Sequence, residues 1–189
     1  MKLPIYLYGH PVLRAESAAV DAVNYPELKQ LIADMFETMY ASDGCGLAAP
    51  QIGRNERIVV IDADVFKDDH PECAGRRMAL VNPVVEVLDG EEVCRPEGCL
   101  SLPGLSENVN RVEHIRLTWT DENMQSHTEE IGGFLARIVQ HECDHLDGKL
   151  YMDHVSGTRR MLLRAKLRNI IEGKVRCDYP VRTAPKKRK

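Results

Sequence analysis

Apolar residues recur every three or four positions between residues 28 and 40, which is the spacing of one face of an α-helix. Tyr25-Pro26-Glu27 precedes this stripe, and a proline is tolerated in the first turn of a helix. The pattern therefore predicts a helix that ends near Tyr40. Its buried face is made by Leu28, Leu31, Ile32, Met35, Phe36 and Met39.

The middle of the chain alternates short apolar runs with turn residues, a pattern typical of antiparallel strands. Turns are predicted at Asn82-Pro83, at Asp89-Gly90 and at residues 121–123. The polar stretch between Val65 and Arg77 is predicted to be a surface loop. We expect strands at residues 57–62, 79–82, 84–88, 91–95, 114–120 and 126–131.

Two further helices are predicted near the C-terminus. One follows Gly132-Gly133, carries the sequence HECDH and ends near Asp147-Gly148, because a glycine commonly follows the last turn of a helix. The other is capped by Ser156 or Thr158 and runs to about residue 172. Together the elements predict an α+β fold, with mostly antiparallel strands packed around a central helix and with a C-terminal helix. We expect one domain at residues 1–173 and a basic extension at 174–189 that is flexible at its end.

Composition narrows the class of protein. The 189 residues carry a formal net charge of −4, which does not favour nucleic-acid binding. No stretch approaches the roughly 18 apolar residues of a membrane helix, and the N-terminal apolar run is too interrupted for a signal peptide. We therefore expect a cytoplasmic protein with no membrane or nucleic-acid function. In such a chain the 6 cysteines favour free thiols or a metal ligand over disulfides.

The pentapeptide HECDH predicts a metal site. Residues four apart share a helix face, so His141 and His145 can bind one ion. Glu142 lies about 100° further round the helix and can reach a water on that ion. Cys143 lies two residues from each histidine and points to the opposite face, where it is expected to pack as a small hydrophobe. The alternative is a pair of surface histidines on an acidic helix end.

A catalytic metal site commonly has three protein ligands and one open position. Cys99 is the attractive third ligand, since Gly98 and the turn at Pro103-Gly104 allow the backbone to approach closely. Composition alone leaves Cys94 as an equal candidate.

Three motifs occur in a characteristic order: GCGLAAPQ at 44–51, EGCLS at 97–101 and QHECDHLDG at 140–148. Together they resemble the three motifs of the peptide deformylases, and PVLRAES at 11–17 resembles an N-terminal region of that family. The resemblance extends from about residue 3 to about residue 170. It implies an enzyme that hydrolyses the N-formyl group of the N-terminal formylmethionine of nascent polypeptides by attack of a metal-bound water or hydroxide, releasing formate.

The resemblance also implies roles for individual residues. It makes Cys99, His141 and His145 the ligands of one divalent metal, which in the family is typically Fe2+, with Zn2+, Ni2+ or Co2+ able to substitute. It makes Glu142 the general base and acid. Two groups would donate to the developing oxyanion: the side-chain amide of Gln51 and the backbone N–H of Leu100. Without the motif, a glutamine at position 51 would be expected at the surface.

The substrate peptide is implied to lie extended along the backbone of Cys45, Gly46 and Gly98. One and two turns before His141, Ile138 and Phe134 are candidates for the methionine pocket, with core packing as the alternative. At positions 45 and 137, relatives can have apolar residues where this chain has Cys45 and Arg137.

Three charged residues are expected to support this site. Glu97 and Arg111 are expected to form an ion pair that braces the loop of Cys99, and Asp144 is expected to anchor the helix end. The alternative for each is a solvated charge. The C-terminal helix and the basic tail form a candidate surface for the ribosome near its exit tunnel.

Two other functions fit part of the pattern. A zinc peptidase could use the same HExxH sequence, although its third ligand usually lies downstream of the helix rather than upstream at Cys99. A non-catalytic protein could use the metal only to hold its fold, but it would have no need of Glu142, Gln51 and Gly46.

Overall fold

The computed structural model describes residues 1–21 and 24–185. Its strands are β1 (Ile5–Tyr6), β2 (Gly46–Ala48), β3 (Ile58–Asp62), β4 (Arg77–Val87), β5 (Glu92–Gly98), β6 (Ser106–Val112), β7 (His114–Thr120), β8 (Ser126–Gly132) and β9 (Val181–Arg182). Its helices are α1 (Leu28–Ala41), α2 (Gly133–Leu146), α3 (Gly157–Leu162) and α4 (Arg164–Ile171), and short 3-10 helices lie between them. No helix in the described part of the chain is long and apolar enough to span a membrane.

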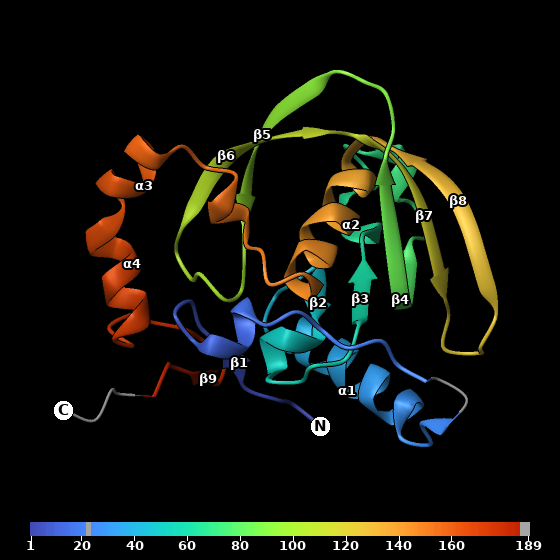
Figure 1. Cartoon of the computed structure of the whole chain (residues 1–189), viewed down its shortest axis with the longest axis horizontal. Coiled ribbons are helices and arrows are strands. Elements are labelled where there is room, and N and C mark those ends of the chain that lie inside the picture. The colour runs from blue at the N-terminus through green and yellow to red at the C-terminus, as the bar shows by residue number, and fades with distance from the viewer. Residues whose placement is uncertain (22–23, 186–189) are drawn as a thin grey trace.

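A five-stranded antiparallel sheet forms the centre of the molecule, with the strand order β2-β3-β4-β7-β8 (Figure 1). Its strand β3 is buried on both sides. Successive side chains of a strand point to opposite faces of the sheet, so neighbouring residues of β3 pack against different helices. Val59 and Ile61 belong to the hydrophobic cluster that contains the buried residues of α2, called here the cluster of α2. Ile58 and Val60 belong to the hydrophobic cluster that contains the buried residues of α1, called here the cluster of α1. The two helices therefore cover opposite faces of the sheet. This arrangement confirms the predicted α+β fold around the helix that carries HECDH.

Two smaller strand pairs complete the fold. The hairpin β5–β6 forms its own antiparallel sheet, and β1 pairs with β9 in parallel. In Figure 1 the hairpin lies between α2 and the helices α3 and α4. Ser156 caps α3 by accepting a hydrogen bond from the N–H of Arg159, as the sequence predicted. The predicted single helix over 156–172 is instead divided at Leu163 into α3 and α4.

The predicted turn at Asn82-Pro83 is wrong, because β4 continues through it. Asn82 has a φ of 50°, and the pairing with β7 shifts register between Val81 and Val84. The Asn82 side chain bonds the N–H and the C=O of Val20, both at 2.8 Å. These contacts hold the irregular residue inside a bulged strand, where the proline's missing N–H is tolerated.

The structure describes only part of the predicted C-terminal extension. Val175 and Val181 pack against a third hydrophobic cluster, to which α4 contributes Leu167 and Ile170. Tyr179 packs against the cluster of α1. Residues 186–189, on which the predicted flexible end falls, lie outside the described residues. The domain boundary at residue 173 stays a prediction.

Candidate active site

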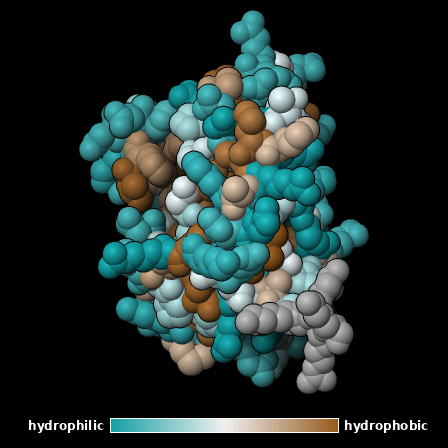
Figure 2. Space-filling model, turned by 90° about the vertical axis from the view of Figure 1, so that its left-hand side faces the viewer, coloured by the Kyte–Doolittle hydropathy of each residue, from teal (hydrophilic) through white to brown (hydrophobic). Residues whose placement is uncertain are grey.

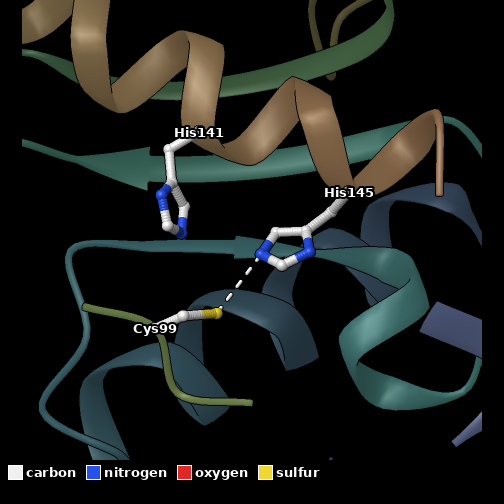
Figure 3. A group of neighbouring side chains, drawn as sticks. All are labelled: Cys99, His141 and His145. Atoms are coloured by element: carbon white, nitrogen blue, oxygen red, sulfur yellow. Dashed lines mark hydrogen bonds between the residues drawn. The ribbon is translucent and has the colours of Figure 1, made fainter. Parts of the chain in front are cut away.

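Helix α2 presents His141 and His145 on one side (Figure 3). Their ring centroids lie 5.3 Å apart, as expected for residues one turn apart. The apolar side of α2 packs on the sheet, and Cys143 lies in this core cluster. Burial raises the pKa of the Cys143 thiol, which therefore stays protonated. Cys143 is a packing residue, as the helix geometry predicted.

Cys99 faces the two histidines from the loop that follows β5. The ligand atoms of Cys99, His141 and His145 all lie within 4.8 Å of one another, and the Cys99 Sγ is 3.3 Å from His145 Nε2. Burial raises the pKa of the Cys99 thiol, but the adjacent His145 and His141 outweigh it and lower that pKa to about 5. Cys94, the other candidate from composition, is exposed on β5. The structure therefore separates the two cysteines in favour of Cys99.

The donor set fits a divalent metal ion. A thiolate and two imidazoles converge on one point, which is the ligand chemistry of a catalytic metal with an open position. The Nδ1 of His145 is buried, and no described group forms a hydrogen bond with it. His141, by contrast, is oriented by a hydrogen bond of 2.8 Å between its Nδ1 and the Glu97 carboxylate. Such a bond leaves Nε2 of His141 directed toward the other ligand atoms.

Glu97 is the centre of a buried charge network. Its carboxylate accepts hydrogen bonds from Arg111 at 2.7 and 3.1 Å and from Arg137 at 2.7 Å, besides its contact with His141. Burial raises the pKa of Glu97, but hydrogen bonds with His141 and Arg111 outweigh it and hold that pKa well below its usual range. The ion pair expected between Glu97 and Arg111 is present, and Arg111 also pairs with Asp144 at 3.0 Å. The network links the hairpin β5–β6 to α2.

Arg137 is a member of this network that the sequence analysis missed. Its side chain is 2% exposed and bonds Glu97 and Glu113, each at 2.7 Å. It also donates to the carbonyl oxygens of Val93 and Val109. The available signal was an arginine inside the otherwise apolar run FLARIV, because a buried guanidinium needs several acceptors.

Glu142 lies beside the ligand group and is also buried, with its Oε2 unpaired among the described residues. Burial raises the pKa of Glu142 to about 7, against the lowering effect of His141 and His145. Gly46 makes room for this carboxylate: a Cβ at position 46 would lie 2.6 Å from the Glu142 Cδ. A carboxyl group that titrates near neutral pH can both accept and return a proton.

Gln51 is buried next to Cys99. Its Oε1 accepts the N–H of Ala48 at 2.8 Å, which fixes the amide so that Nε2 points toward the Cys99 Sγ at 3.3 Å and Ser101 Oγ at 3.2 Å. At 1% exposure it is no surface amide. Leu100 follows Cys99 in a turn closed by the Leu102 N–H and the Cys99 carbonyl, 2.9 Å apart. In such a turn the N–H of the second residue takes no part in the closing bond.

A cavity of about 640 Å³ opens onto this group. Its lining includes Gln51, Cys99, Leu100, His141 and Glu142, together with the predicted peptide-binding residues Cys45, Gly46 and Gly98. Residues 176–179 of the C-terminal segment also line the cavity, which the sequence analysis did not foresee.

Phe134 and Ile138 are placed differently. Phe134 stacks on His70 and packs edge-on against Phe66, and Ile138 is buried in the core cluster of α2. Neither is among the described residues that line the cavity. These contacts agree with the packing alternative, and the assignment of both to a methionine pocket stays a prediction.

Comparisons with known proteins give one consistent result. Residues 2–161 match the family described as polypeptide deformylase. A peptide deformylase of Flavobacterium psychrophilum is 41% identical over 100% of both chains, and one of Salinibacter ruber is 42% identical over 97% of this chain and 95% of its own. The crystal structure of peptide deformylase from Thermus thermophilus aligns with a TM-score of 0.79 and 38% identity, covering 92% of this chain and 99% of that one. The structure of a peptide deformylase from Legionella pneumophila aligns with a TM-score of 0.80 and 35% identity, covering 93% and 99%. The chain therefore belongs to the polypeptide deformylase family, a family of hydrolases.

Proposed function

We propose that this protein removes the N-formyl group from the N-terminal formylmethionine of newly made polypeptides, releasing formate and a free amine. The observation that carries the proposal is the buried Glu142 carboxylate, which lies beside three converging metal-ligand atoms in a cavity that also contains Gln51 and Leu100. A proton carrier, a ligand set and two oxyanion donors are the parts that amide hydrolysis needs.

Cys99, His141 and His145 would hold one divalent metal. When bound, the metal lowers the pKa of a water ligand toward neutrality and so supplies a nucleophile at physiological pH. Fe2+ is the ion expected from the resemblance, and Zn2+, Ni2+ or Co2+ would fit the same donors.

The protein's own groups then handle the proton and the charge. Glu142 accepts the proton of the attacking water and returns it to the departing amine, a task that suits a pKa of about 7. The Gln51 Nε2 and the Leu100 N–H donate to the oxygen of the former formyl carbonyl as it becomes negative. Each such donor contributes about 3 kcal/mol to stabilising the transition state.

The extended substrate peptide is proposed to bind beside β2. This strand lies at the edge of the five-stranded sheet and begins at Gly46, next to the cavity. An edge strand has unpaired backbone groups that a peptide can bind as an added strand. In this arrangement Cys45, Gly46 and Gly98 contact the residues around the formylated methionine.

The proposal is tested by the release of formate from formyl-Met-Ala-Ser, measured on protein purified without oxygen and analysed for its metal. Wild type should release formate and leave unformylated peptides intact, whereas a zinc peptidase would cleave the latter. Glu142→Ala should retain the metal and lose at least about 100-fold in kcat, within the range of a lost acid–base group. A wild type that binds metal and releases no formate would favour the non-catalytic alternative. A fully active Glu142→Ala would refute the mechanism.

The same proposal places the enzyme where translation occurs, and it makes the ribosome a candidate partner. Figure 2 shows the side of the molecule on which α3 and α4 lie, mostly hydrophilic with separate hydrophobic patches. On α3, Met161 and Leu162 are 69% and 72% exposed beside Arg159 and Arg160. Exposed apolar residues next to cations suit a partner that has both phosphate and protein surfaces. Arg160→Glu should weaken co-sedimentation with ribosomes while leaving formate release unchanged. Unaltered co-sedimentation would remove α3 from the proposal.

A further inference from the structure

The C-terminal segment that follows α4 returns to the active site. Residues 176–179 line the same cavity as Glu142 and Cys99. The segment is held there by β9, which pairs in parallel with β1. The Ile5 N–H donates to the carbonyl of Pro180 and the Leu7 N–H to that of Arg182, both at 2.8 Å. This part of the cavity wall is therefore anchored by backbone hydrogen bonds.

One side chain of the segment contacts the catalytic loop directly. The hydroxyl of Tyr179 donates to the backbone carbonyl of Leu100 at 2.8 Å. Both Tyr179 and Leu100 are partly buried against the apolar cluster of α1. Packing therefore fixes the position of the Tyr179 ring. Its hydroxyl holds the backbone carbonyl of Leu100, the residue whose N–H is the proposed oxyanion donor.

Other contacts hold the groups on either side of this carbonyl. The Cys99 carbonyl accepts the N–H of Leu102, and the Ser101 carbonyl accepts the N–H of Tyr8 at 2.8 Å. The Leu100 N–H shares a planar peptide unit with the Cys99 carbonyl, and the Leu100 carbonyl shares the next planar unit with the Ser101 N–H. The Leu100–Ser101 unit is the middle of the turn that the Cys99 carbonyl and the Leu102 N–H close. By holding this middle unit, the Tyr179 hydroxyl stabilises the turn, and through the turn it stabilises the preceding unit, which contains the Leu100 N–H.

We propose that Tyr179 is a positioning residue for catalysis, and that it keeps the Leu100 N–H directed at the oxyanion by holding the Leu100–Ser101 peptide unit and, with it, the turn of residues 99–102. The inference rests on the proposed deformylase function. It adds the C-terminal segment to the parts of the protein that the reaction needs. Tyr179 does not touch the reacting atoms, and its effect passes through the loop of residues 99–102.

The first test compares Tyr179→Phe with Tyr25→Phe in the metal-loaded, full-length protein. Both tyrosines are half-buried and bonded through the hydroxyl, but Tyr25 bonds Glu56 away from the cavity. Tyr179→Phe should lower kcat for formyl-Met-Ala-Ser by about three- to tenfold, as expected for one lost hydrogen bond, with KM changed by less than about twofold. Tyr25→Phe should leave both constants unchanged. Equal kcat values for Tyr179→Phe and wild type would overturn the inference, as would a rise in KM alone.

The second test does not depend on activity. Hydrogen exchange followed by mass spectrometry should show the amides of residues 100–102 exchanging about three- to tenfold faster in Tyr179→Phe than in wild type, with the amides of α1 unchanged. Unchanged exchange in this loop would overturn the inference whatever the kinetics show. A failure of the proposed function would appear differently, because wild type itself would then release no formate.

Discussion

Gly46→Ala adds a single methyl group at the point where β2 passes Glu142. Its backbone does not have a positive φ, so alanine introduces no conformational strain there. The new Cβ would lie 2.6 Å from the Glu142 Cδ and 2.7 Å from its Cγ. Ordinary contact begins at 3.4 Å, so the Glu142 Cδ must retreat by at least about 3.4 − 2.6 = 0.8 Å, and Oε1, which would lie closer still, must move with it. The substitution therefore tests whether the position of Glu142 matters to the reaction.

A displacement of this size has a large expected effect on the rate. Misplacing a reacting group by about 1 Å can cost on the order of 100-fold, because the catalytic group no longer meets the substrate in the productive geometry. We expect Gly46→Ala to lower kcat by about 50- to 100-fold, or roughly 2.5 kcal/mol in the activation free energy. The metal ligands lie on other residues, so the metal content should stay at the wild-type level.

The assay is formate release under substrate saturation, with metal analysis and a thermal unfolding curve for each variant. Gly157→Ala is the matched control, since a Cβ at that position of α3 would meet no atom within 4 Å. The control should keep the wild-type kcat. If Gly46→Ala retains more than about half of the wild-type kcat, the placement of Glu142 by this close approach is refuted.

Substitutions at three further positions test the packing and the charges. Cys143→Ala should keep the metal and the wild-type kcat and lower the free energy of unfolding by about 1 kcal/mol, measured in urea, because it removes a small buried group; lost metal would contradict the packing role. Arg137→Met should lower the free energy of unfolding, measured in urea, by about 3 kcal/mol, since it leaves the buried carboxylates of Glu97 and Glu113 without this partner. Arg137→Lys should not restore this stability, because lysine lacks the planar guanidinium that bonds both carboxylates. Partial burial raises the pKa of Asp153, but the hydrogen bond and charge of Arg14 outweigh it and hold that pKa below its ordinary value. A lowered carboxyl pKa stabilises the fold above the unfolded pKa and loses this contribution as pH falls through the folded pKa. Asp153→Asn should therefore lower the free energy of unfolding by about 1 kcal/mol at pH 7, a small effect because the pair is half-exposed. This difference from wild type should shrink as the pH falls below the ordinary pKa of an aspartate, and a difference that does not change with pH would refute the assignment.

Local rules were enough to predict part of the site. The four-residue spacing of His141 and His145 fixes their common helix face whatever surrounds the helix, and the same rule places Cys143 in the core. The helix at residues 28–41 was likewise predictable, because its single apolar face agrees with its burial against the sheet. Cys99 and Gln51 approach the helix from other segments of the chain. Their place in the site could be predicted only from the order of the three motifs.

Tertiary contacts decided the features that the sequence analysis missed. Strand β6 reads SENVNRV, which has few apolar residues, and it forms a strand because it pairs with β5 and buries Arg111 against Glu97. Asn82-Pro83 has the composition of a turn, but the contacts of Asn82 with Val20 keep it within β4. A local pattern cannot show partners that lie this far away along the chain.

The pairing of β1 with β9 has a consequence for the order in which the protein folds. Ile5 and Val181 are partners although 181 − 5 = 176 positions separate them. Closing so long a loop has a high entropic cost, which contacts formed earlier must already have reduced. We therefore expect the sheet and α2 to form first and the β1–β9 pair to form last. Because this pair holds Tyr179 against Leu100, catalytic activity should return after the helical signal during refolding, and the delay should measure the docking of the C-terminal segment.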